Sequence, residues 1–211
     1  MNIVVRKEYK GYDQLPIPIE GNTGKYKNYQ DYLHKFISCI KPKRILEIGF
    51  NAGHSACCML NAYESASMYS FDICRYGTEQ VAFDVLKQHF DLTLIPGNSV
   101  ETIPKFINDT KLTFDFVFVD GGHEYEVPYH DIIHTKDVIN DQGFMLIDDL
   151  GVGSVNECIY RSNILNEFDS YKILDLEKDI LLLHKNIDSN KNIMSSLTDE
   201  LLSKLVKTKQ L

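Results

Sequence analysis

The sequence lacks the features that would place a protein in or across a membrane. It contains no run of eighteen consecutive apolar residues, and its N-terminal segment, Met-Asn-Ile-Val-Val-Arg-Lys-Glu, reaches charged residues before any long apolar stretch. A helix that spans a bilayer needs about 20 mostly apolar residues, and a signal peptide needs an apolar segment of its own. We therefore expect no membrane span, no signal peptide and no membrane partner, and a cytoplasmic location.

Paired cysteines and an excess of positive charge are also missing. The five cysteines form no Cys-x-x-Cys pair, and most of them lie in apolar stretches. An odd number in that setting indicates reduced, buried thiols and not a disulfide framework. The formal net charge is −8, whereas proteins that hold nucleic acid usually carry a basic surface. We expect no nucleic-acid partner, and we interpret the lysines between residues 7 and 43 as a solvated helix face.

The sequence has the composition of one compact domain. Its 211 residues are 44% apolar and 25% charged, which is enough to bury a sizeable core. Short apolar stretches alternate with longer amphipathic ones, a pattern that predicts a parallel sheet covered by helices on both faces. The predicted strands are residues 44–48, 67–72, 92–95, 114–119 and 144–147. The predicted helices are residues 26–40, 53–63, 78–90, 100–107, 127–138 and 154–168.

The C-terminal part of the chain predicts a different arrangement. Residues 171–176 and 179–184 are expected to form a closing antiparallel strand pair. Residues 195–211 place four leucines on one stripe, with acidic residues early and lysines late, which favours a helix. That stripe must cover a surface of this domain or of a second subunit, so a homodimer through this helix or the N-terminal helix is one expectation. We divide the chain into an N-terminal segment and helix (1–42), a sheet domain (43–185) and a helical tail (186–211).

Two of the predicted strands run directly into glycine turns. Residues 44–53 read Arg-Ile-Leu-Glu-Ile-Gly-Phe-Asn-Ala-Gly, and residues 114–125 read Phe-Asp-Phe-Val-Phe-Val-Asp-Gly-Gly-His-Glu-Tyr. Such turns at one edge of a parallel sheet are typical of a nucleotide-type binding site. The first turn has only two glycines, Gly49 and Gly53, so it differs from the dinucleotide-binding fingerprint. Asn51 lies between them and is able to adopt a left-handed conformation.

In this order the motifs resemble the class I S-adenosylmethionine-dependent methyltransferases, in the small-molecule O-methyltransferase branch that includes macrocin- and catechol-O-methyltransferase-like proteins. Members of that branch carry a Val-Asp-Gly-x-His-x-Tyr segment after the fourth strand and an Asp-Asp pair after the fifth, here residues 119–125 and Asp148-Asp149. The resemblance covers about residues 43–185. It implies a single α/β domain with a Rossmann-like, doubly wound sheet, mostly parallel and with a C-terminal antiparallel pair. It also implies methyl transfer from S-adenosylmethionine to a hydroxyl of a sugar, phenol or glycoside.

The resemblance assigns cofactor contacts to several strand ends. In the family, the acid equivalent to Glu47 reaches the amino end of the methionine moiety; alternatively, Glu47 bonds the amides of the glycine turn. Asp72 matches an acid that binds the two ribose hydroxyls, and its alternative role is a turn cap. Asn98 and Ser99 follow the third strand, where the family holds adenine, but Ser99 is equally suited to cap the next helix. The expected cofactor contacts are Glu47, Gly49, Asn51, Gly53, Asp72, Asn98, Ser99 and Asp120.

Three aspartates are predicted to converge at the same edge of the sheet. Asp120, Asp148 and Asp149 end neighbouring strands, and their carboxylates would repel one another unless a cation or a donor network lies between them. Magnesium suits such oxygen ligands, and metal-dependent relatives place their ligands at positions that match these three. The alternative is that one aspartate only caps the following helix and that no metal binds. A magnesium ion is therefore an expected, optional cofactor.

His123 is the candidate general base, with Asp120 beside it. Some metal-dependent relatives have a second aspartate where this chain has Gly122, so His123 is left as the group whose ordinary pKa lies near the working range. Its alternative role is structural, bonding Asp120 or the sheet edge.

Two other classes of function stay open at this point. The first is a nicotinamide-dependent oxidoreductase, which the two-glycine turn disfavours. The second is a noncatalytic protein that binds S-adenosylmethionine and docks a partner through a terminal helix, which the converging carboxylates and histidine disfavour. The sequence does not specify the small-molecule acceptor, whose contacts are expected from residues 11–27 and from the segment after Asp149.

Overall fold

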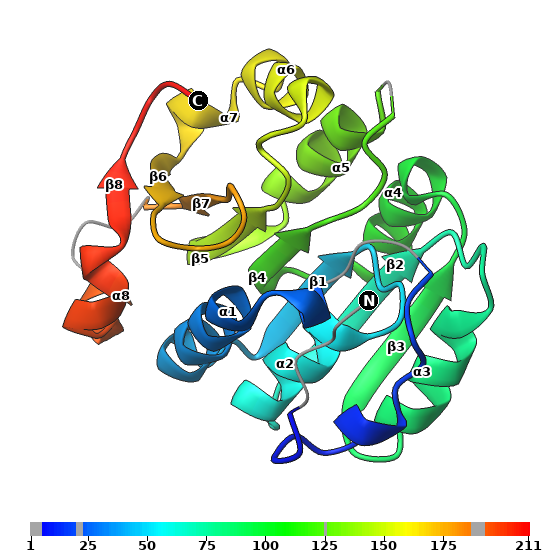
Figure 1. Ribbon diagram of the computed structural model, residues 1–211. Helices are drawn as coiled ribbons and strands as arrows, with labels where there is room; N and C mark the ends of the chain where they lie inside the picture. The colour runs from blue at the N-terminus through cyan, green and yellow to red at the C-terminus, as the bar shows by residue number, and fades with distance from the viewer. Residues whose placement is uncertain (1–5, 20–22, 125, 187–192) are drawn as a thin grey trace.

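The structure is a computed structural model that describes residues 6–19, 23–124, 126–186 and 193–211 (Figure 1). These residues form one eight-stranded sheet in the order β3-β2-β1-β4-β5-β7-β6-β8. The first five strands are parallel to one another. Their bounds are β1 Arg44–Ile48, β2 Ser67–Asp72, β3 Asp91–Pro96, β4 Phe114–Val119 and β5 Ile139–Ile147. The predicted α/β fold with a mostly parallel sheet is confirmed.

The remaining strands are antiparallel to their neighbours. β7 (Leu181–His184) pairs with β5, and β6 (Asp169–Ile173) pairs with β7. This is the predicted closing pair. A further strand, β8 (Leu205–Lys207), pairs with the outer edge of β6 and was not predicted.

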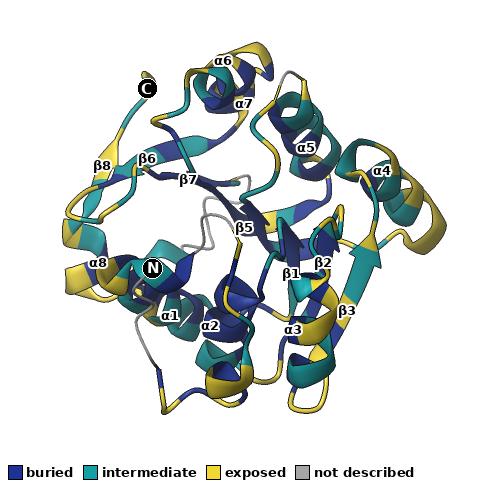
Figure 2. Ribbon diagram, turned by 45° about the vertical axis from the view of Figure 1, so that its right-hand side comes forward, coloured by how far each residue is buried: buried dark blue, intermediate teal, exposed yellow. Residues whose placement is uncertain are grey.

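Helices cover both faces of the sheet and create two separate apolar cores (Figure 1). One face carries α1 (Lys27–Ile40), α2 (His54–Ala62), α3 (Thr78–Leu86) and α8 (Asp199–Ser203). The other face carries α4 (Ser99–Thr110), α5 (Val127–Lys136), α6 (Gly153–Arg161) and α7 (Ile164–Glu167). Figure 2 shows that the central strands are buried, whereas β3 at the sheet edge is only partly so.

The sequence of β4 explains why it lies in the middle of the sheet. Phe116 and Phe118 point into the core under α1, and Phe114, Val117 and Val119 point into the opposite core. A strand buried on both faces is apolar at nearly every position, which is why its bounds were predictable from the sequence. The predicted bounds of residues 44–48, 67–72 and 114–119 agree with β1, β2 and β4.

The single helix predicted over residues 154–168 was wrong, because the chain forms two helices there. α6 ends at Arg161, and Asn163 adopts a left-handed conformation with φ of 61° before α7 begins. The Ser162 hydroxyl accepts the N–H of Ile164 at 3.3 Å, which offers the backbone an alternative to the helical hydrogen bond. Asparagine tolerates the left-handed region better than most residues, so the break falls at Asn163.

The continuous helix predicted over residues 195–211 was also wrong. Only the five residues of α8 are α-helical, and the chain then becomes β8. The exposed edge of β6 provides the reason: Leu174 donates its N–H to the Lys204 carbonyl at 2.9 Å, and Thr208 donates its N–H to the Ser170 carbonyl at 2.8 Å. Pairing satisfies an edge that would otherwise be open.

The tail therefore completes the sheet of its own chain. Leu201, one of the predicted leucine stripe, is 1% exposed and belongs to the same core as α1. Leu201 therefore covers a surface of its own domain. The homodimer and the boundaries at residues 42/43 and 185/186 stay predictions.

Two further expectations concern membranes and cysteines. Among the described residues, no helix has the length and apolar character to cross a bilayer. All five cysteines are free thiols. Cys57, Cys58 and Cys158 are buried, as predicted, whereas Cys39 and Cys74 are only partly buried.

Candidate active site

A pocket of about 800 Å³ opens at the carboxyl ends of the parallel strands. Backbone hydrogen bonds hold these ends together, since the Asp120 N–H reaches the Ile48 carbonyl at 2.9 Å and the Asp148 N–H reaches the Val119 carbonyl at 3.0 Å. Eight predicted site residues line the pocket: Gly49, Asn51, Asp72, Asn98, Ser99, Asp120, His123 and Asp149. Glu47, Gly53 and Asp148 are not part of its lining.

The first glycine turn brings the ends of β1 and β4 into close contact. Gly49 has φ of 94°, and a Cβ at this position would lie 2.0 Å from the carbonyl oxygen of Asp120. No larger residue fits there without moving β4 away. Asn51, with φ of 47°, adopts the left-handed conformation that the sequence analysis allowed for it, and Gly53, with φ of 75°, adopts it as well. A Cβ on Gly53 would lie 3.0 Å from Ala82, so Gly53 serves the packing of α2 against α3.

Asp72 ends β2 with both carboxylate oxygens directed at neighbouring backbone. Oδ2 accepts the N–H of Asn51 at 2.9 Å, and Oδ1 accepts the N–H of Cys74 at 2.7 Å. The two roles weighed from the sequence are thus compatible, because Asp72 holds the turn and also lines the pocket. Each carboxylate oxygen has more than one lone pair, so the group is still able to accept hydroxyl donors from a ligand.

The loop after β3 settles which residue caps α4. Asn98 is the N-cap, and its Oδ1 accepts the N–H of Val100 at 3.1 Å. Ser99 is the first residue of the helix, so the capping role considered for Ser99 belongs to Asn98. Both residues line the pocket. Their contact with adenine stays a prediction.

Glu47 lies behind the pocket wall and is fully buried. The parallel register of β1 and β2 places Ser70 beside Glu47, and the hydroxyls of Ser70 and Ser55 each donate to one of its oxygens at 2.6 Å. Burial raises the pKa of Glu47 to about 7, while these two hydrogen bonds oppose the rise. Ser55, which lines the pocket, separates Glu47 from it. The partners are serine hydroxyls, not the amides of the glycine turn.

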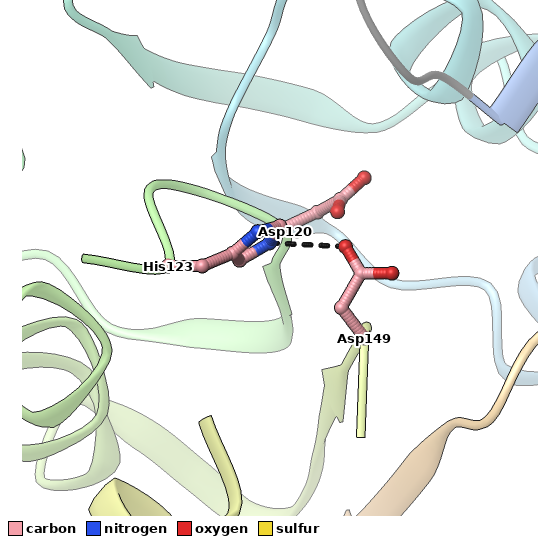
Figure 3. Close-up of side chains that lie close together, drawn as sticks. All are labelled: Asp120, His123 and Asp149. Atoms are coloured by element: carbon pink, nitrogen blue, oxygen red, sulfur yellow. Dashed lines mark ion pairs between the residues drawn. The ribbon is translucent and has the colours of Figure 1, made fainter. Parts of the chain in front are cut away.

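His123 forms a pair with Asp149, and both residues line the pocket (Figure 3). Its Nε2 lies 3.0 Å from Asp149 Oδ2, and its side chain is 41% exposed. The hydrogen bond to Asp149 raises the pKa of His123 above its ordinary range, and the same bond lowers the pKa of Asp149. The partner of His123 is thus Asp149, where the structural alternative had named Asp120 or the sheet edge. The Ser154 hydroxyl donates to the His123 carbonyl at 2.7 Å and holds this loop in place.

The carboxylate of Asp148 forms hydrogen bonds with Asp149 and Lys178. It is 2% exposed, its Oδ1 accepts the N–H of Asp149 at 2.6 Å, and its Oδ2 accepts a hydrogen bond from the Lys178 ammonium. Lys178 Nζ also lies 3.3 Å from Asp149 Oδ1. Burial alone would lower the pKa of Lys178, but the charges of Asp120 and Asp148 outweigh it and raise that pKa.

These contacts decide how well the predicted metal ligands suit a divalent ion. Burial and the charge of Asp148 raise the pKa of Asp120 well above its usual range, which makes it a poorer ligand. Among the described residues, the group able to bring three ligand atoms within 4.8 Å of one another is Asp120, His123 and Asp149. The predicted set with Asp148 does not fit, because the Lys178 ammonium already lies against Asp148 and Asp149.

Lys178 is the main residue of the pocket that the sequence did not reveal. It lies in the turn between β6 and β7, within the segment Glu177-Lys178-Asp179. A lysine between two acids in a strand turn is usually solvated, so no local signal marked it. It contacts the site only because β7 pairs with β5, which carries Asp148 and Asp149 at its end.

Several buried polar atoms of the pocket residues have no protein partner. Within the described parts of the chain, no hydrogen bond reaches Thr23 Oγ1, His54 Nδ1 or Glu79 Oε2, and all three residues line the pocket. Buried polar groups are normally hydrogen-bonded. These three atoms therefore keep unused hydrogen-bonding capacity beside the pocket.

Residues 46–150 match a family model described as a methyltransferase domain. The chain belongs to this methyltransferase family. The matched segment runs from β1 to the residue after Asp149, so it includes every predicted site residue of the methyltransferase, while Lys178 lies beyond it. Tyr125 of the motif at 119–125 lies outside the described residues. None of the curated proteins matches the methyltransferase significantly.

Solved structures share the fold of this methyltransferase. The O-methyltransferase TomG from Streptomyces achromogenes, involved in tomaymycin synthesis and solved with SAM, is 14% identical, with a TM-score of 0.66 over 87% of this chain and 92% of TomG. The Bacillus cereus O-methyltransferase solved with SAH is 13% identical, with a TM-score of 0.63 over 82% of this chain and 86% of that one. The SAH-bound methyltransferase PaMTH1 from Podospora anserina is 18% identical, with a TM-score of 0.58 over 74% and 77%.

Proposed function

We propose that this protein transfers a methyl group from S-adenosylmethionine to a hydroxyl of a small molecule such as a sugar, phenol or glycoside. The observation that carries the proposal is one pocket that holds a ribose-type acid, Asp72, together with a histidine–carboxylate pair, His123 and Asp149. The family match supports methyl transfer over the hydride transfer of an oxidoreductase. The relatives solved with SAM and SAH support the same donor.

The donor half of the pocket would be formed by the ends of β1, β2 and β3. Asp72 accepts from the two ribose hydroxyls, in the way acids at this position do in related nucleotide sites. Asn98 and Ser99 contact the adenine edge, and the turn from Gly49 to Gly53 passes beneath the donor. Glu47 acts through Ser55, because the Ser55 hydroxyl donates to Glu47 and so leaves its oxygen lone pairs to accept from the amino group of the donor.

The acceptor half would be formed by His123 and Asp149. Bound S-adenosylmethionine supplies a methyl group on a positively charged sulfur, already activated for displacement. Asp149 holds His123 Nε2 as the protonated nitrogen, which leaves Nδ1 to take the proton of the acceptor hydroxyl. The acceptor oxygen would bond to the methyl carbon, and the electron pair of the broken carbon–sulfur bond would stay on sulfur. The proton on His123 then passes to solvent, to which this side chain is open.

Donor binding provides the direct test of this function. We expect S-adenosylhomocysteine to raise the melting temperature, because a ligand that binds only the folded state stabilises it by mass action. Asp72→Ala should weaken that binding by roughly 1 to 3 kcal/mol, the value of a charged hydrogen bond. Asp109→Ala is the matched control, since Asp109 is an exposed aspartate on α4 that pairs with Lys105. Calorimetric titration of the two variants measures the difference.

Two results would count against the proposal. Binding of NAD(H) in place of S-adenosylhomocysteine would favour the oxidoreductase, and equal affinities of the Asp72 and Asp109 variants would remove Asp72 from the site. Incubation with S-adenosylmethionine and pooled phenols, sugars and glycosides then identifies the acceptor from the S-adenosylhomocysteine released. Donor binding without turnover across such pools would favour the noncatalytic alternative.

A further inference from the structure

The Lys178 ammonium lies inside the group of carboxylates where a metal ion was expected. It contacts Asp148, whose side chain is completely buried, and lies 3.3 Å from Asp149 Oδ1. The Lys178 side chain is itself only 12% exposed, yet it lines the pocket. Its Nζ also lies 5.7 Å from the centre of the Tyr26 ring and 5.8 Å from that of Tyr29, over faces that favour a cation.

The turn that carries Lys178 is fixed on both sides of the lysine. On one side, the Glu177 carboxylate accepts the N–H groups of Asn28 and Tyr29, both at 3.1 Å. α1 has no side-chain cap at its own N-cap residue, so Glu177 supplies the cap from a distant part of the chain. On the other side, the Asp179 carbonyl accepts the N–H of Leu150 at 3.1 Å, directly after Asp149. These hydrogen bonds hold the turn, and with it Lys178, in a fixed position beside Asp149.

The same contacts leave Asp149 poorly suited to a divalent ion. Its Oδ2 faces His123, and its Oδ1 faces the ammonium. A magnesium ion would have to approach one of these oxygens to about 2.1 Å, close to a fixed positive charge. Repulsion between the two cations in a partly buried site opposes this.

We propose that the Lys178 ammonium takes the place of a divalent ion in this cluster, so that the enzyme needs no metal. Lys178 neutralises Asp148 and Asp149, and its charge faces the acceptor oxygen as that oxygen loses its proton. The role of Lys178 toward the acceptor oxygen rests on the function proposed above, whereas the exclusion of metal does not.

Manganese binding tests the exclusion directly. Mn²⁺ prefers the same oxygen ligands as Mg²⁺, and its electron paramagnetic resonance signal in solution falls when it binds protein. The protein is first freed of metal with a chelator, and Mn²⁺ alone is then titrated into the parent, Lys178→Met, Lys178→Arg and Lys105→Met. Methionine keeps the length and packing of the lysine side chain without its charge. Lys105 is the matched control, because it is 78% exposed on α4 and pairs with one aspartate.

We expect the parent, Lys178→Arg and Lys105→Met to leave the Mn²⁺ signal unchanged. Lys178→Met should bind one Mn²⁺ with an affinity at least about 10- to 100-fold above the limit that the unchanged signal sets for the parent, because the carboxylates are then left without a cation. Uptake of Mn²⁺ by the parent that is lost in Asp149→Asn would overturn the proposal. Failure of both the parent and Lys178→Met to bind would overturn it as well, since the ammonium would not be what excludes the metal.

Two further measurements separate this inference from the proposed function. S-adenosylhomocysteine binding reports on the function and on folding in each variant, and its absence in the parent would reject the function while leaving the Mn²⁺ result intact. With an acceptor in hand, turnover by the parent should be unchanged by EDTA, and Lys178→Met should lower it by about 10²- to 10³-fold. Loss of parental turnover in EDTA and its recovery with Mg²⁺ would overturn the metal-free mechanism.

Discussion

At the scale of single residues, we predict that the pairing of His123 with Asp149 sets the pH range of the reaction. A general base must be neutral to accept a proton, and the hydrogen bond to Asp149 raises the pKa of His123. Turnover should therefore rise with pH through a midpoint above the ordinary histidine value of about 6.5. A structural histidine at this place would give no such midpoint.

Substitution of His123 and of Asp149 separates the role of His123 as the base from the role of Asp149 in raising its pKa. His123→Gln should lower turnover by about 10²- to 10⁴-fold, the usual contribution of a positioned base, with little change in S-adenosylhomocysteine affinity. Asp149→Asn removes the main cause of the raised pKa of His123, so the midpoint of its pH–rate profile should move to lower pH. Turnover rates measured over a pH series check both. Near-parental turnover of His123→Gln would return His123 to a structural role.

Glu47 gives a second residue-scale prediction, this one about stability. Burial raises its pKa from 4.5 to about 7, so between these values the unfolded chain loses a proton that the folded protein keeps. The contribution of Glu47 to stability is therefore fully present below about pH 4.5 and is lost as pH rises through about 7. Glu47→Gln cannot ionise, so its stability relative to the parent should improve by on the order of 3 kcal/mol between pH 4.5 and 8.

Urea denaturation of the ligand-free protein at several pH values measures this difference. Glu101→Gln is the control, because Glu101 is an exposed carboxyl on α4 and its removal involves no burial. A difference between Glu47→Gln and the parent that does not vary with pH would show that folding does not raise the pKa of Glu47.

At the scale of elements, β1, β2 and β4 were predictable because their apolar sequences and glycine turns are local signals. The Asp72 and Asn51 positions followed from the same signals, since a strand end fixes where its next residue points. β8 was not predictable, because three residues become a strand only where β6 leaves an edge free. Lys178 was missed for a related reason: its place depends on β7 pairing with β5, which is a contact distant in sequence.

The cap of α1 by Glu177 is another such distant contact and is open to measurement. Glu177→Ala removes the acceptor for the N–H groups of Asn28 and Tyr29 and should destabilise the protein by about 0.5 to 2 kcal/mol, as lost N-caps do. Glu200→Ala is the control, because Glu200 is 60% exposed and forms a surface ion pair with Lys35 that should contribute little. Equal midpoints of urea denaturation for the two variants would show that Glu177 does not cap α1.

At the scale of the whole molecule, the site and the C-terminal segment lie at different parts of one sheet. The predicted donor contacts lie at the ends of β1, β2 and β3, whereas β8 forms the opposite edge of the sheet (Figure 1). α8 packs beside α1 through Leu201, which belongs to the same apolar core as the buried residues of α1. The C-terminal segment should therefore contribute to stability with little effect on donor affinity.

Shortening the chain after Thr198 tests this separation. The truncated protein loses the burial of Leu201, which is 1% exposed and whose replacement by alanine should alone cost about 2 to 5 kcal/mol. It also leaves the edge of β6 unpaired, which should favour self-association. Val206→Ala is the matched control on β8, because Val206 is 45% exposed and its replacement should change stability by about 0.5 kcal/mol or less.

Urea denaturation should give the truncated protein and Leu201→Ala a much lower free energy of unfolding than Val206→Ala. Calorimetric titration of the folded proteins with S-adenosylhomocysteine should give similar affinities. A loss of affinity in Leu201→Ala in proportion to its loss of stability would mean that the C-terminal segment and the donor site form one cooperative unit.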